Sequence, residues 1–142
     1  WKRTSSPPSM AAFNAPTREQ CTVRRERTNT PLQALVLMND PQFVEAARRL
    51  AEHTLSGHTD DAARAAWMLT TVLCRPAKEV DTKDVLAAAT GFRTIFQQKP
   101  DAAKKLINTG DSTPDATLDA VDLATWTMVA NTLMNRDDFL NK

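Results

Sequence analysis

Apolar residues recur every three or four positions along most of this chain, which is the spacing of one face of an α-helix. The clearest stripe runs from Phe43 to Leu55 and closes at Gly57, a residue type that commonly ends helices. Further stripes occupy residues 62–73, 85–96 and 123–133. No alternating strand pattern of useful length and no repeat period is visible. The pattern therefore predicts an all-α fold.

Two helix starts are marked by local chemistry. Thr30 precedes Pro31 and Asp40 precedes Pro41, so in each case a side-chain oxygen can cap the helix and a proline occupies its first position. We expect Thr30 and Asp40 to be structural caps of two helices that meet at a corner near Asn39. The first of these helices is short, and its apolar side is formed by Leu32, Leu35 and Val36.

The remaining helices are bounded by acidic caps, prolines and a glycine. Asp60 or Asp61 is expected to cap a helix that ends before Pro76, and Asp81 or Thr82 to open another that runs to Pro100. The positions expected to point inward from the latter helix are Val85, Ala88, Ala89, Phe92, Ile95 and Phe96. A short helix near residues 101–108 and a last one around residues 123–133 complete an irregular bundle of about six helices.

The first 29 residues differ from the rest, because Pro7, Pro8 and Pro16 lie among serines and alanines. Proline lacks a backbone donor and restricts the residue before it, so we expect an extended, irregular arm. This arm, residues 1–29, is assigned to the same domain as the helical part, residues 30–142. A chain of 142 residues is long enough for one domain with a single core.

The charges nearly balance, with 18 basic and 17 acidic residues and a net charge of +1. The net charge is too small to create an electrostatic field that would attract nucleic acid or an anionic bilayer. No apolar run approaches the roughly 20 residues needed to span a membrane. We therefore expect neither a nucleic-acid partner nor membrane insertion. Cys21 and Cys74 form no metal or haem motif, and we interpret them as separate thiols, with a disulfide between them as the alternative.

Motifs that carry catalysis are missing from the sequence. The three glycines are isolated, so no phosphate-binding loop is formed, and the G-x-S-x-G nucleophile motif is absent. His53 and His58 are five positions apart, which is not the spacing of a helical metal pair. Paired aspartates lie where helices begin or end, where capping explains them. We accordingly predict no catalytic residue and no metal site.

One cluster of charge remains, just ahead of the first predicted helix. Arginine can hold a carboxylate, sulfate or phosphate through two parallel hydrogen bonds, so this cluster is the best anion-binding candidate in the chain. Its members are Arg18, Arg24, Arg25 and Arg27. The favoured interpretation is that these arginines form internal ion pairs and hold the arm against the helix corner at Asp40. The candidate partners are Glu19, Glu26, Asp40 and Glu45.

Two stretches of this sequence resemble a known family. The segment FNAPTREQCTVRRERTNTPLQALVLMNDPQFVEAARRLA resembles the C-terminal domain of unknown function 1553 of planctomycete-type cytochrome c domain proteins, and LATWTMVANTLMNRDDFL is similar to the family's closing A-W-x-x-V-A-N-x-L-L-N element. WKRTSSPPSM is similar to the segment upstream of the family's F-D-x-P motif, which implies that the chain starts inside that domain. Asn14 stands where the family usually has aspartate, and residues 136–138 replace an L-D-E pattern.

The resemblance implies an exported or periplasmic multidomain protein, with a c-type haem possible in another domain and no cofactor in this one. The family supplies no reaction and no catalytic residue. We therefore expect a non-catalytic structural and interaction module whose partners are the other domains of the parent protein. The alternative is that the arginine cluster contributes a site for an acidic or sulfated glycan to a carbohydrate-processing or redox enzyme.

Overall fold

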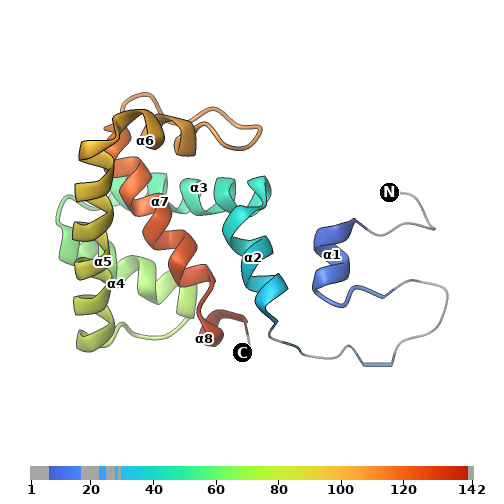
Figure 1. Ribbon diagram of the computed structural model, residues 1–142. Helices are drawn as coiled ribbons and strands as arrows, with labels where there is room; N and C mark the ends of the chain where they lie inside the picture. The colour runs from blue at the N-terminus through green and yellow to red at the C-terminus, as the bar shows by residue number, and fades with distance from the viewer. Residues whose placement is uncertain (1–6, 17–22, 25–27, 29, 141–142) are drawn as a thin grey trace.

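The computed structural model describes residues 7–16, 23–24, 28 and 30–140, and within them the chain is all α-helical, without strands. This confirms the predicted fold class (Figure 1). The helices of the described residues are α1 (Pro8–Ala12), α2 (Pro31–Asn39), α3 (Pro41–Gly57), α4 (Asp61–Leu73), α5 (Glu79–Gln98), α6 (Pro100–Ile107), α7 (Ala120–Met134) and α8 (Asp137–Leu140). Helices α2 to α7 correspond to the six that the sequence predicts.

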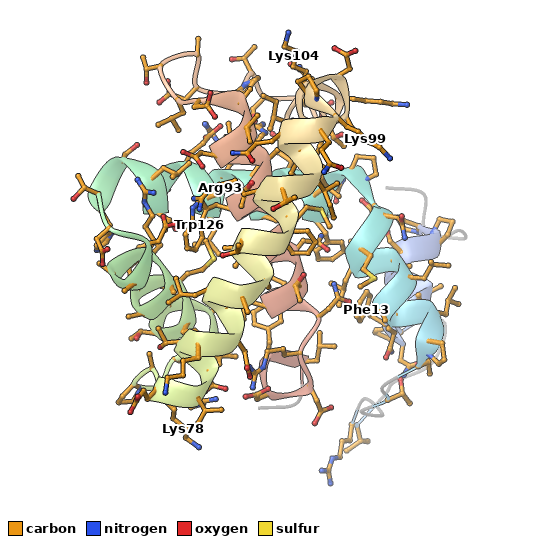
Figure 2. The ribbon with its side chains drawn as sticks, turned by 60° about the vertical axis from the view of Figure 1, so that its left-hand side comes forward. Phe13, Lys78, Arg93, Lys99, Lys104 and Trp126 are labelled. Carbon is orange, nitrogen blue, oxygen red and sulfur yellow. The ribbon has the colours of Figure 1, made fainter. Side chains whose placement is uncertain are left out.

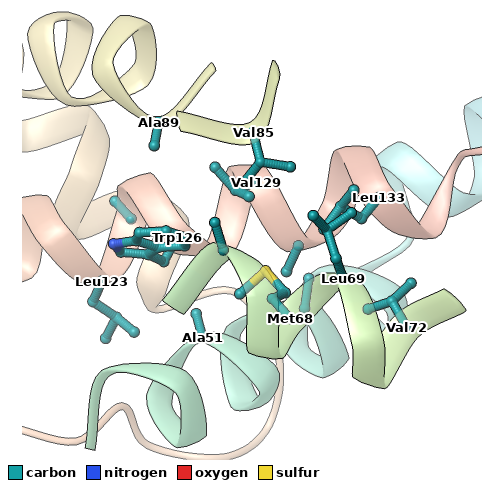
Figure 3. Packing of buried hydrophobic residues seen from close by; sticks show 14 of the residues in the cluster. Ala51, Met68, Leu69, Val72, Val85, Ala89, Leu123, Trp126, Val129 and Leu133 are labelled. Atoms are coloured by element: carbon teal, nitrogen blue, oxygen red, sulfur yellow. The ribbon is translucent and has the colours of Figure 1, made fainter. Parts of the chain in front are cut away.

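Helix α7 lies at the centre of the bundle and packs mainly against α3, α5 and α6 (Figure 1). Because neighbours cover it on several sides, nine of its fifteen residues are buried. Trp126 on α7 is fully buried, and Met68 and Leu69 of α4 belong to the same core (Figure 3). The core also contains Ala47, Ala51, Ala65, Ala89, Ala103, Ala124 and Ala130. Such small side chains let helix axes approach one another closely.

The corner between α2 and α3 is built by the two expected caps. The Thr30 hydroxyl accepts a hydrogen bond from the Gln33 amide at 3.3 Å, and the Gln33 side chain accepts one in return from the Thr30 amide at 2.9 Å. The Asp40 carboxylate accepts from the Gln42 amide at 3.0 Å. Helix α2 is fastened to the central helix where the Asn131 side chain donates to the Leu37 carbonyl.

Gln33 also attaches the N-terminal arm to the bundle. Its side chain is buried, and its Nε2 donates to the Ala12 carbonyl at 2.9 Å and to the Thr28 hydroxyl at 2.8 Å. The Asn14 side chain donates to the same hydroxyl, and the rings of Phe13 and Phe43 lie 6.2 Å apart. The described part of the arm is thus held by neutral groups.

Three details differ from the sequence-based predictions. The arm contains helix α1, because Pro8 occupies a first helical position that suits its fixed φ, whereas we expected an extended arm throughout. Helix α5 begins at Glu79, ahead of Asp81 and Thr82, and Asp81 instead binds arginines. Ile95, expected to point inward, is half exposed because no neighbouring helix covers that position.

Within the described residues, none of the helices combines the length and the hydropathy that crossing a bilayer requires.

Candidate functional site

The structure describes only one of the four arginines that form the predicted anion site. Arg24 is exposed and makes no ion pair with another described residue. Arg18, Arg25 and Arg27 lie outside the described residues. Two of the carboxylates proposed as their partners are engaged elsewhere, since Asp40 caps α3 and Glu45 binds the loop after α6.

The most elaborate polar arrangement is centred on Arg48, which is fully buried on α3. Its Nη1 donates to Glu52 Oε1 at 2.5 Å, one turn further along the helix. Its Nη2 donates to the Ser112 carbonyl at 2.8 Å and to the Ser112 hydroxyl at 2.7 Å. A charge placed in the core is costly unless it is paired and hydrogen-bonded, and these contacts satisfy both terminal nitrogens, while the buried Nε has no hydrogen-bond partner among the described residues. Arg48 thereby joins α3 to the loop that precedes α7.

Glu45 holds the same loop from one turn earlier on α3. Its carboxylate accepts from the Asp111 amide at 2.9 Å, from the Ser112 amide at 3.0 Å and from the Ser112 hydroxyl. The hydrogen bond from the Ser112 side chain, followed by those from the two amides, lowers the pKa of Glu45 to about 2. Gly110 has a φ of +106°, and a Cβ there would collide with the Glu45 side chain. The loop therefore needs glycine at this position.

Glu52 lines a polar cleft of about 360 Å³ together with Arg49, His53, Ser56 and Asp115. Burial alone would raise the pKa of Glu52, but hydrogen bonds from Arg49, the Asp115 amide and Arg48 outweigh it and lower the pKa. Both carboxylate oxygens of Glu52 are engaged by these donors. Acid–base catalysis needs a carboxylate that is free to exchange a proton, so Glu52 is better suited to a structural role.

Two further clusters of ion pairs connect the other helices to one another. Arg93 on α5 (Figure 2) donates to Asp61 of α4 and to Asp122 of α7, each at 2.9 Å. Arg75 and Arg136 both bind Asp81 and Asp138, which links the loop after α4 to the start of α5 and to α8. These clusters are partly exposed, so each contributes modestly to stability while fixing how the helices are placed.

The two histidines and the described cysteine have different surroundings. His53 is exposed, and His58 lies against the Trp67 ring with centroids 5.6 Å apart. Cys74 is an exposed free thiol at the end of α4, and Cys21 lies outside the described residues. Among the residues that can be described, no three His, Cys, Asp or Glu side chains gather in a way that could hold a metal ion.

Helix α2 leaves an apolar surface uncovered, which we call the outer face of α2. It consists of Leu32, Leu35 and Met38, which are 58%, 57% and 51% exposed. A spacing of three residues places them along one side of the helix. On the other side, Gln33 and Leu37 are each only 3% exposed. A patch of three such side chains is within the range that monomeric proteins commonly expose.

The network around Arg48 was not singled out by the sequence-based reasoning. One local signal does exist: Arg48 lies four positions after Val44 and three before Ala51, and therefore on the apolar side of α3, with Glu52 four positions further on. A charge on an apolar stripe with an opposite charge one turn away indicates a buried pair. Ser112 is 64 residues away, and no local pattern indicates it.

A family model described as "Protein of unknown function (DUF1553)" matches residues 1–89, a region that runs from the arm into α5. No curated protein and no solved structure matches the chain. The matched region does not include residues 123–140, so the similarity of that segment to the closing element remains a prediction.

Proposed function

Since the chain belongs to the DUF1553 family of proteins of unknown function, we propose that it is a non-catalytic structural and interaction module of an exported multidomain protein. Its partners are the other domains of that protein. The resemblance to planctomycete-type cytochrome c proteins supports a c-type haem in one of those domains, while this module supplies no ligand to it. The export and the domain context rest on that resemblance.

The observation that supports this proposal best is the position of Arg48. It is the only fully buried ionisable side chain among the described residues, and its two terminal nitrogens are engaged by Glu52 and Ser112. In a reactive site, the polar groups at the centre remain able to meet a substrate. Here they join a helix to a loop. This arrangement favours a rigid scaffold over a catalyst.

Limited proteolysis of the parent protein tests the structural role. Arg48→Ala leaves Glu52 without its buried partner and is expected to destabilise this module, so that it opens more often and exposes cleavage sites in the neighbouring domains as well. Arg49→Ala is the matched control, since Arg49 is a surface residue that binds the same glutamate. If the neighbouring domains of the Arg48→Ala protein resisted protease as well as those of the wild type, the structural role would be rejected.

A second candidate function is binding of an acidic or sulfated glycan by the arginine cluster. It is favoured by Arg24, which is exposed and has no ion-pair partner among the described residues. Titration with a sulfated oligosaccharide at low and at physiological salt should give heat that falls as salt rises, because screening weakens exposed charge pairs. The unsulfated oligosaccharide and the Arg24→Gln variant are the controls. Heat that did not depend on sulfate or salt would exclude this function.

A further inference from the structure

Helices α1 and α8 differ from the other helices of the described residues, because neither contains a buried side chain. They are also the shortest, with five and four residues. A helix of this length is unstable in water on its own, since forming its first turn costs more free energy than its few hydrogen bonds return. Each of the two helices therefore depends on the groups that attach it to the bundle.

Helix α8, which follows the end of α7 (Figure 1), is attached by charged groups and by one aromatic side chain. Asp138 accepts hydrogen bonds from Arg75 Nη2 and from Nε and Nη2 of Arg136, each at 3.1 Å. Both arginines also bind Asp81 of α5, so the four side chains form a closed ring of alternating charge. We call this ring the Asp138 cluster. Phe139 is partly buried and packs against the core.

The Asp138 cluster is open to solvent and therefore to dissolved ions. The side chains of Asp138 and Arg136 are 42% and 33% exposed, whereas that of Arg48 is fully buried. Attraction between exposed charges is weak, and its range falls from about 10 Å at 0.1 M salt to about 3 Å at 1 M, while buried pairs are screened much less. Raised salt therefore weakens the attachment of α8 before it affects the contacts of Arg48.

The other exposed ion pairs do not control a helix in this way. Arg93 connects α4, α5 and α7, but each of these helices also buries several apolar side chains. Screening leaves that burial intact, so the three helices stay in place. Among the described residues, α1 is held by the neutral hydrogen bond from Gln33 to Ala12 and by the contact of Phe13 with Phe43. Helix α8 thus differs from α1 in depending on charge.

We propose that α8 is an ionic latch, a helix that ion pairs hold against the bundle and that detaches when salt screens them, while α2 to α7 remain folded. Detachment frees the Asp138 carboxylate from both arginines and uncovers the part of the core on which Phe139 packs. Elements with few buried contacts are those that open locally at low free energy. The latch goes beyond the proposed structural role, because it makes the attachment of one helix respond to the surrounding solution.

Fluorine NMR of the 142-residue chain tests the latch, with 4-fluorophenylalanine at position 139 in one sample and at position 13 in another. Between about 0.1 M and about 1 M KCl, the solvent-exposed fraction of the probe at Phe139 should rise at least about threefold. The probe at Phe13 is the matched control and should not change, because the described contacts of α1 carry no charge. The helical circular dichroism signal of the bundle should be retained at both salt concentrations.

Asp138→Asn should open the latch without added salt. The amide keeps the shape of the carboxylate but not its charge, so the probe at Phe139 should be more exposed at low salt and should lose most of its response to KCl. Glu79→Gln is the control for removing a carboxylate, since the pair of Glu79 and Lys83 lies within α5 and is largely exposed. That variant should respond to KCl as the wild type does.

Each contrary outcome would overturn the latch. A probe at Phe139 that did not respond to KCl would show that packing holds α8. Equal responses at Phe13 and Phe139, or loss of the helical signal along with the response, would indicate that salt loosens the whole fold. An Asp138→Asn chain that kept the full wild-type response would show that salt acts at groups other than Asp138.

Discussion

Arg48 and Glu52 lie one turn apart on α3 and form an ion pair of 2.5 Å that is almost closed to solvent. The same arginine binds both oxygens of Ser112, 64 residues further along the chain. A local helical pair and a long-range contact therefore share one guanidinium. The position of the loop after α6 therefore depends on a buried side chain of α3.

Arg48→Ala should be among the most destabilising single substitutions in the described residues. The substitution takes the buried counter-charge from Glu52, which keeps only the exposed Arg49 and the Asp115 amide, and loss of one partner of a buried pair typically lowers the free energy of unfolding by about 3–5 kcal/mol. For a domain of this size the thermal midpoint should fall by about 10 °C or more, measured by circular dichroism. Arg49→Ala, at the exposed arginine that also binds Glu52, should cost less than about 1 kcal/mol. Equal losses in the two variants would contradict the importance of burial.

Gly110→Ala should destabilise the loop that Glu45 holds. A φ of +106° is unfavourable for a side-chain-bearing residue, and the added Cβ would meet the Glu45 side chain, so we expect a loss of more than about 1 kcal/mol. Gly91→Ala is the natural control, because Gly91 lies within α5 and a Cβ there meets nothing within 4 Å. That variant should be stabilised by roughly 0.5–1 kcal/mol. Chemical denaturation measures the change in the free energy of unfolding of both variants. A change of the same sign in both would show that the loop does not require glycine at position 110.

The helix starts could be predicted because their causes are local. Thr30 and Asp40 each precede a proline, and a cap followed by a proline works through contacts within one turn. Ile95 shows the limit of this reasoning, since a stripe predicts which residues share a face but not how much of that face a neighbouring helix covers. Helix α1 was missed for a related reason, because Pro8 is compatible with an extended arm and with a first helical position.

The candidate site was less predictable than the fold. The contact between Arg48 and Ser112 depends on how α3 and the loop after α6 meet in space, which composition and periodicity do not encode. The arginine cluster was singled out because charged residues adjacent in sequence are easy to recognise, and three of its four members lie outside the described residues. The described part of the arm is held at Gln33 by neutral hydrogen bonds. The sequence pattern grouped Leu32, Leu35 and Val36 on one apolar side of the helix after Thr30, whereas the structure exposes Leu32, Leu35 and Met38.

The stability of the fold should depend on pH in the acid range through Glu45. Its pKa is lowered from 4.5 to about 2 in the folded chain, chiefly by the hydrogen bond from Ser112. A group whose pKa is lower in the folded state stabilises that state above its unfolded pKa. This contribution is fully present above 4.5 and is lost as the pH falls from 4.5 towards 2. The lowered pKa of Asp138, held by Arg136 and Arg75, adds a dependence of the same sign.

Thermal melts of Glu45→Gln and of the wild type across this range measure the effect of Glu45. The variant should be less stable at neutral pH, and its midpoint should change less steeply below pH 4.5 than that of the wild type. Asp84→Asn, at an exposed carboxyl on α5, is the control and should follow the wild-type curve. Parallel curves for the wild type and Glu45→Gln would show that the loop contact does not govern acid stability.

Gln33→Ala should release the arm while leaving the bundle folded. The substitution removes the hydrogen bonds to Ala12 and Thr28 and half of the capping box with Thr30, each of which contributes on the order of 1 kcal/mol. The helical core around Trp126 does not include these contacts, so the circular dichroism of the bundle should change little. Brief proteolysis should instead cut the variant near residues 13–16 faster than the wild type. Gln42→Ala, an exposed glutamine at the start of α3, is the matched control. A cleavage pattern in Gln33→Ala that equalled the control would mean that the Phe13 and Phe43 rings suffice to hold the arm.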